Sequence, residues 1–305
     1  MATYSHSQRL TASNVNDHLT DTAERATTEA CVTCGTALHG RFCHACGERA
    51  CGHDEFRLRT FLAHSFNAVF DVDSRLLRSF RMLLTRPGLL TAEYMAGRRR
   101  PYLGPVQIFL IANLVFFAVL SVMDGASTFT TPLRYHANQI VYGDIAADLI
   151  ARQGAAGTDA ARAFEERFDE TVPRYANSMV ILLAPLLAAL LALFMLRRRR
   201  PFLQHLVLSL HFLAFLMLVM LMFPLLVHAL YAILPNRWLA GDNEMLFTTM
   251  LILVFGLYLT RASGVVYGAG RIHSWLIGFG VALLFLPALV VYRMILFFTV
   301  YVSLL

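Results

Sequence analysis

Five long apolar segments occupy most of the chain after residue 105, and no other feature limits its fold so strongly. Segments of this length are typical of helices that cross a lipid bilayer, where each backbone amide is bonded within its own helix. The composition agrees, because 57% of the residues are hydrophobic and the mean hydropathy is +0.56, too apolar for an ordinary soluble domain. We therefore predict an all-α integral membrane protein with about five transmembrane helices. The predicted spans are 106–123, 176–196, 206–234, 245–260 and 275–301.

The distribution of arginine predicts how these spans are oriented. All 26 basic residues are arginine, so part of this usage reflects genome composition rather than selection at single sites. Nineteen of the 26 lie before residue 106 or in the turns 197–205 and 261–274. The positive-inside rule then places the N-terminus in the cytoplasm and the C-terminus outside. A four-span alternative, in which 245–260 is re-entrant, returns the C-terminus to the cytoplasm.

A polar loop, residues 124–175, separates the first two predicted spans and carries eight acidic residues. Within it, Ala160, Phe164, Phe168 and Val172 recur every four residues, with acidic side chains away from them. This period predicts a short amphipathic helix, which the topology places on the outer side. Arg293, inside the fifth span, is predicted to extend towards the outer headgroups.

The first 30 residues contain neither a hydrophobic period nor an apolar run. Their polar composition predicts a disordered tail. A secretory signal peptide needs an apolar core of 7 to 15 residues, which is not found here. The N-terminus is therefore expected to remain in the cytoplasm.

All five cysteines lie between Cys31 and Cys51, which favours a metal site over a disulfide framework. Two C-x-x-C-G turns, with eight residues between Cys34 and Cys43, supply Cys31, Cys34, Cys43 and Cys46. Four thiolates suit the tetrahedral preference of Zn²⁺, and the glycine after each second cysteine permits a tight turn. We predict a small zinc ribbon over 31–50 with one structural Zn²⁺ and no open position for a substrate water.

Other interpretations of the cysteine segment remain. The same four thiols could form a rubredoxin-like iron site or a redox-active group. His39, His44 and the pair Cys51 and His53 are candidates for substitute ligands, although we interpret them as solvated bystanders.

Residues 55–105 are predicted to form amphipathic helices on the cytoplasmic side. One covers 55–70, and a second begins near Asp73 or Ser74 and ends before Pro87 and Gly88. The second places leucine and phenylalanine on one face and arginine on the other. Such a helix can lie in the headgroup layer or pack against the protein's own membrane helices, and the sequence does not choose between them.

The segment 86–105, here named the pivot, joins the polar part of the chain to the first span. Tyrosines at headgroup depth and arginines facing lipid phosphates are typical of an interfacial anchor. A specific site for a phosphate-bearing lipid is the alternative. The candidate residues for contact with anionic lipid are Tyr94, Arg98, Arg99, Arg100 and Tyr102.

The predicted membrane interior carries few polar groups. His205, His211 and His228 lie on or near the third span, and His205 and His211 are too far apart on a helical wheel to form an i, i+4 ligand pair. We interpret them as groups that hydrogen-bond between helices or near headgroups. All 20 acidic residues lie outside the predicted spans, which weakens an interpretation as an ion-coupled transporter.

The ribbon and the pivot together resemble a bacterial membrane family known only as a domain of unknown function. The pattern is C-x-x-C-G, C-x-x-C-G-E, then P-G-x-x-x-x-x-Y-x-x-G-R-R-x-x-Y-x-x-P. The residues that carry it are Cys31, Cys34, Gly35, Cys43, Cys46, Gly47, Glu48, Pro87, Gly88, Tyr94, Gly97, Arg98, Arg99, Tyr102 and Pro105. The resemblance implies a bacterial inner-membrane protein and supplies no activity. With the topology predicted from the arginines, the C-terminus is then expected in the periplasm.

We therefore expect a non-enzymatic membrane protein whose zinc ribbon docks a cytoplasmic protein or supports the cytoplasmic face. The expected lipid partner is anionic, no nucleic acid is expected, and homo-oligomerisation is left open. The alternative is a transport or lipid-handling protein in which Asn113 and a third span kinked at Pro224 line a path. A third hypothesis is an enzyme acting on lipid phosphates through Arg98–Arg100, although the sequence offers it no nucleophile or base.

Overall fold

The computed structural model describes residues 30–40, 42–48, 75–122, 129–154, 157–198, 200–233 and 244–305, with the side chains of 197 and 223–248 left aside. Apart from Ala30, the predicted tail over 1–30 lies outside these residues. The predicted helix over 55–70 and the candidate ligands Cys51 and His53 also lie outside them.

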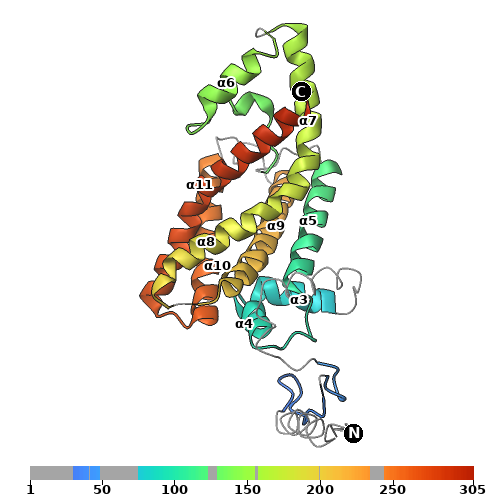
Figure 1. The fold of residues 1–305 in the computed structure, drawn as a ribbon, viewed down its shortest axis with the longest axis vertical. Coiled ribbons are helices and arrows are strands. Elements are labelled where there is room, and N and C mark those ends of the chain that lie inside the picture. Colours follow the sequence, from blue (N-terminus) through green and yellow to red (C-terminus); the bar gives the residue numbers. More distant parts are fainter. Residues whose placement is uncertain are drawn as a thin grey trace, which may run out of the picture.

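The described part of the chain is helical and contains no strand beyond an isolated bridge between Ala30 and Ala37, as the fold prediction requires. Five of its helices are long and apolar enough to cross a membrane, so the prediction of an all-α multi-pass membrane protein is confirmed. They appear in Figure 1 as a bundle below a smaller helical layer. The five are α5 (Pro105–Val122), the continuous segment α7–η3–α8 (Asp159–Met179, Val180–Leu182, Leu183–Phe194), α9 (Phe202–Ile233), α10 (Glu244–Tyr267) and α11 (Arg271–Ser303).

Helix α9 forms the centre of the bundle. In its apolar segment Phe202–Met222, 78% of the residues are buried, against 33–44% in the other four candidate spans. Helices α5 and α8 pack against it. This position explains why α9 is apolar around its whole circumference, since a helix surrounded by neighbours has no face for water.

Helices α10 and α11 pack closely as an antiparallel pair joined by a short turn (Figure 1). Small residues allow this approach: a Cβ added at Gly278 would lie 2.1 Å from Thr260 Oγ1 and 2.5 Å from the carbonyl oxygen of Gly256. Membrane helices gain dispersion energy where small residues bring their backbones together. Because α10 is 24 residues long, about 36 Å, it can span the bilayer core, which favours five spans over four.

Two short helices, α3 (Arg75–Thr85) and α4 (Leu89–Met95), lie at one end of the bundle. Ser79 and Leu83 of α3 are buried, and Ser79 Oγ accepts a hydrogen bond from the amide of Leu103 at 2.9 Å. Leu77, in contrast, is 77% exposed. One face of α3 therefore packs against the protein itself, and a second apolar face remains free.

The corner between α3 and α4 requires a glycine. Gly88 has φ = +81°, a value that favours glycine, and a Cβ there would lie 2.7 Å from both Cα and O of Ala262 in α10. The Pro87–Gly88 turn that ends the predicted second helix is thus also a contact between the pivot and the α10–α11 pair.

The loop between the first two spans folds into a cap over the opposite end of the bundle, which contains η2 (Leu133–Tyr135), α6 (Gly143–Ala151) and the start of α7 (Figure 1). Its core is aromatic, and Phe164 and Phe168 lie beside Phe297 or Tyr301 of α11. At 33 residues α11 is about 50 Å long, longer than the hydrocarbon core, so its C-terminal part is available for this contact.

His136 occupies the centre of the cap and is fully buried. Its Nδ1 lies 2.7 Å from the Tyr142 hydroxyl and its Nε2 lies 3.1 Å from the carbonyl oxygen of Thr131. Burial lowers the pKa of His136 from 6.5 to about 4, and Arg293 contributes in the same direction. Arg293 therefore lies near this cap, and its extension towards the outer headgroups stays a prediction.

The structure joins two elements that hydropathy separates. The short helix expected around 160–172 and the span expected over 176–196 form one continuous helical segment from Asp159 to Phe194, which contains Pro173 and changes direction between α7 and α8 (Figure 1). Hydropathy changes near residue 176 because the surroundings change there, while the backbone remains helical. Three of the four residues of the predicted apolar period form the buried face, because Phe164, Phe168 and Val172 are at most 2% exposed, whereas Ala160 in the first turn is exposed.

A four-cysteine centre attached to the membrane domain

The two C-x-x-C-G turns have the same backbone geometry. In each, the glycine amide donates to the carbonyl oxygen of the first cysteine, from Gly35 to Cys31 and from Gly47 to Cys43, both at 2.8 Å. The two glycines have φ = 75° and 70°, which side chains rarely adopt. The repeated turn explains why glycine follows the second cysteine in both motifs.

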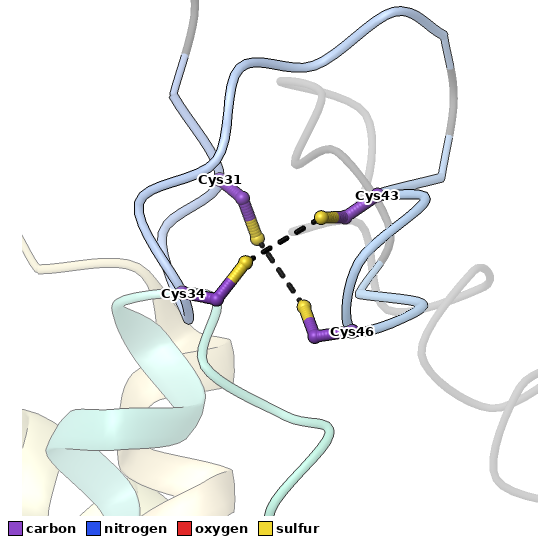
Figure 2. Close-up of side chains that lie close together, drawn as sticks. All are labelled: Cys31, Cys34, Cys43 and Cys46. Carbon is purple, nitrogen blue, oxygen red and sulfur yellow. Dashed lines mark hydrogen bonds between the residues drawn. The ribbon is translucent and has the colours of Figure 1, made fainter.

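The two turns face each other and bring the four predicted cysteines together (Figure 2). The Sγ atoms of Cys31 and Cys46 are 3.6 Å apart, those of Cys34 and Cys43 are 3.5 Å apart, and all four lie within 4.8 Å of one another. A tetrahedral zinc with bonds of about 2.3 Å requires sulfur atoms about 3.8 Å apart. The cluster can therefore hold a metal ion with little rearrangement.

The cluster also favours deprotonation of one thiol. A hydrogen bond with the Thr36 hydroxyl, 3.3 Å from Cys34 Sγ, lowers the pKa of Cys34 to about 6. A thiolate at neutral pH is the form that binds metal. His39 and His44 lie with ring centroids 5.6 Å apart and are not part of the four-sulfur group.

Glu48, the residue after the second turn, connects this centre to the pivot. Its Oε2 accepts hydrogen bonds from the backbone amides of Arg99 at 3.1 Å and Arg100 at 2.9 Å. The same oxygen accepts a hydrogen bond from Thr33 Oγ1 at 2.7 Å, so one carboxylate joins the first turn, the second turn and the pivot. Glu48 is only 5% exposed, which strengthens these charge-assisted bonds.

A second contact reinforces this attachment. A Cβ added at Gly47 would lie 3.2 Å from Cζ of Arg100, so the guanidinium rests against the second turn. No sequence pattern indicated either contact, because the partners of Glu48 are backbone amides 51 and 52 residues further along the chain.

Among the three arginines predicted to contact lipid, Arg98 and Arg99 interact with side chains of the pivot itself. Arg98 forms a bidentate ion pair with Glu93, with Nε–Oε2 at 2.5 Å and Nη2–Oε1 at 2.7 Å, and this hydrogen bonding lowers the pKa of Glu93. Arg99 lies over the ring of Tyr94, 4.6 Å from its centroid. Tyr102 is half-buried, and Arg100 is exposed beside the ribbon. Their contact with anionic lipid stays a prediction.

Two arginines after the second span donate hydrogen bonds to carbonyl groups at the C-terminal end of α10. Arg198 Nη1 donates to the carbonyl oxygens of Tyr267 and Gly268, both at 3.3 Å, and Arg200 Nη2 donates to that of Tyr267 at 3.4 Å. Carbonyls at a helix C-terminus carry partial negative charge, which cations stabilise. Part of this arginine cluster is therefore structural.

The polar residues of the third span hydrogen-bond between helices, as interpreted from sequence. His205 Nδ1 lies 2.8 Å from the Tyr267 hydroxyl, and His211 Nδ1 lies 2.8 Å from Thr91 Oγ1 of α4. Asn113 of α5, only 7% exposed, donates from Nδ2 to the backbone and side-chain oxygens of Asn177 at 2.9 and 3.0 Å. The side chains of Pro224 and His228 are outside those described.

One segment of the chain is similar to a known protein family. Residues 73–117, which cover α3, α4, the pivot and most of α5, match a family model described as a protein of unknown function (DUF3667). The four cysteines lie before the matched segment. No curated protein and no solved structure matches the chain. The chain thus has the membrane helices and the four-cysteine centre described above, and a central segment similar to this uncharacterised family.

Proposed function

We propose that this chain is a non-enzymatic, multi-pass protein of the bacterial inner membrane whose zinc ribbon docks a cytoplasmic protein. The observation that carries the proposal is the bonding of Glu48 to the amides of Arg99 and Arg100. It holds a metal module in a defined position where the chain begins its first span. A flexibly tethered module would not need such a link.

Zinc is the metal we propose, because four thiolates in a reducing compartment favour zinc. A four-thiolate site leaves no coordination position for a substrate or a water, which supports a structural role over hydrolysis. We infer a cytoplasmic location for the ribbon from the arginines gathered at its end of the bundle, with the cap and the C-terminus in the periplasm.

The surface of the ribbon supports protein docking. Phe42 is 63% exposed and Val32 is 46% exposed, although the ribbon has only a very small core of its own around Cys31, Leu38 and Cys43. Exposed aromatic residues on a rigid support are common centres of protein interfaces. We propose that Phe42 is the centre of the docking surface.

Site-specific photo-crosslinking in cells tests this function. A photoreactive phenylalanine analogue at position 42 should form a discrete protein adduct. Its formation should be abolished when Cys31 and Cys34 are both replaced by serine. The same analogue at Ile145, which is 57% exposed in the cap, is the matched control and should not give that adduct.

Zinc content and membrane integration are measured on the same variants. The proposal requires that the double serine variant still inserts in the membrane while losing its zinc. An adduct at position 42 that persists without metal, or a purified protein that never contains zinc, would contradict it.

The alternative is a transport or lipid-handling protein. Solute flux in liposomes that disappears on Asn113→Ala would favour transport. The engagement of Asn113 by Asn177 argues instead for a packing role. The lipid-handling alternative has a specific observation in its favour, an arginine-lined cleft at the ribbon's end of the bundle.

A further inference from the structure

A cleft of about 510 Å³ lies between the α3–α4 corner and the α10–α11 pair. Three arginines from three separate parts of the chain line it: Arg86 before the corner, Arg261 on α10 and Arg271 at the start of α11. No sequence pattern grouped these three arginines, because consecutive members are 175 and 10 positions apart.

The three guanidinium groups have no carboxylate within ion-pair distance among the described residues. Arg98, in contrast, forms an ion pair with Glu93, and Arg198 donates a hydrogen bond to a carbonyl oxygen at the C-terminus of α10. Three cations that share one cleft repel one another, and an anion between them relieves that repulsion.

The walls of the cleft are fixed by close backbone packing. Gly88 holds the corner that bears Arg86 directly against Ala262. On the floor, a Cβ added at Gly264 would lie 3.5 Å from Ser274 Oγ, so larger residues there would fill the space between α10 and α11. The cleft is therefore part of the fold and does not depend on a mobile segment.

The position of the cleft corresponds to headgroup depth. Arg261 precedes the end of α10 by six residues, about 9 Å, and Arg271 begins α11. Trp275, also in the lining, stacks on Phe279 with a centroid distance of 5.2 Å, and tryptophan is enriched at the membrane interface.

The surface beside the cleft is apolar and exposed. Trp275, Leu276 and Val265 are 47%, 59% and 49% exposed on helices that we assign to the membrane. A ligand in this cleft would thus contact both arginines and an exposed apolar surface.

We propose that this cleft binds a phosphate-bearing anionic group, and that its source is the headgroup of an anionic phospholipid whose acyl chains lie along α11. Guanidinium groups bind phosphate oxygens in bidentate geometry, and Trp275 lies where the glycerol and first methylenes of a lipid would follow. A soluble phosphate compound has the same anionic chemistry but no use for the apolar side of the cleft.

Tryptophan fluorescence of the full chain can test this proposal. The protein has two tryptophans, so Trp238→Phe leaves Trp275 as the single reporter. The protein is reconstituted in phosphatidylcholine vesicles, and brominated phosphatidylglycerol is added at increasing mole fraction. We expect quenching that saturates well below the mole fraction at which brominated phosphatidylcholine gives the same effect.

Two charge-matched variants identify the site. Arg261→Gln with Arg271→Gln should weaken the preference for phosphatidylglycerol about tenfold. Arg78→Gln with Arg81→Gln removes two exposed arginines from the same end and should change it less than about twofold. The control keeps the loss of positive charge equal between the two proteins.

Competition distinguishes the source of the phosphate. If millimolar inorganic phosphate or glycerol phosphate leaves the quenching unchanged, the lipid headgroup is supported. Displacement by these soluble ions would overturn the lipid as the source, and equal loss of preference in both charge variants would overturn the cleft as the site. The zinc content of each variant, unchanged, shows that the ribbon remains folded.

Discussion

Replacing Glu48 by alanine removes a carboxylate that accepts three hydrogen bonds, from Thr33 and from the amides of Arg99 and Arg100. Glu48 is not one of the four cysteine ligands, so all four remain in this variant. The pivot, however, loses the acceptor for two backbone amides. We expect the ribbon to separate from the pivot while keeping its metal.

The magnitude follows from the contacts. A hydrogen bond to a charged group stabilises by about 1.5–3 kcal/mol, and here two amides share one nearly buried oxygen, so their contributions are not additive. We therefore expect about 2–3 kcal/mol for the docked state, which corresponds to a rise of roughly 30- to 150-fold in the opening of this contact. Glu48→Gln keeps a neutral acceptor and should give a smaller rise.

Hydrogen exchange of the membrane-reconstituted protein measures this opening at the amides of Arg99 and Arg100. Metal content is measured in parallel, because it separates undocking from unfolding of the ribbon. The matched control is Glu93→Gln, which removes the ion pair of Arg98 but leaves both amides bonded to Glu48. Unchanged exchange at the two amides in Glu48→Ala, with metal retained, would refute the attachment inferred here.

Three further outcomes are expected. Gly88→Ala should lower the free energy of unfolding by about 2–4 kcal/mol, because it combines an unfavourable φ with a Cβ 2.7 Å from Ala262. Gly268→Ala is the control, because Gly268 has φ = +60° but lies in open space, so only the backbone strain should be lost there. Equal losses of stability in the two variants would contradict the contact between Gly88 and Ala262. Gly278→Ala should separate α10 from α11 and lower the melting temperature more than Gly264→Ala, where the added Cβ would lie an ordinary 3.5 Å from Ser274 Oγ. The reverse order of melting temperatures would show that close packing does not hold the two helices together. Burial lowers the pKa of His136 to about 4 in the folded cap, so between pH 6.5 and pH 4 the unfolded cap binds the proton more readily than the folded cap. The free energy of unfolding of the cap should therefore fall by up to about 3 kcal/mol as the pH falls from 6.5 to 4. Hydrogen exchange of residues 129–150 should show this loss of stability in acid, and His136→Gln should abolish it.

The hydrophobic pattern was enough to predict the class of fold. Membrane spans are read well from sequence, because a segment in lipid must be apolar along its whole length and must satisfy its backbone internally. The grouping of the four cysteines was equally readable, since a C-x-x-C turn places its two thiols together by local geometry alone.

Local pattern was less informative about where helices continue. Hydropathy separated the cap helix from the second span, although Asp159–Phe194 is helical without a break. It also could not show which face of α3 is buried, because both Leu77 and Leu83 are apolar and only the packed structure distinguishes them.

By itself, then, the sequence determined the membrane character of the chain and the four-sulfur site, because both depend on short-range chemistry. Only the tertiary structure decided that Glu48 joins that site to Arg99 and Arg100, and that Arg86 meets Arg261 and Arg271 in one cleft. These contacts join residues far apart in the chain through backbone amides and packed glycines, whose partners have no signature in the order of the residues.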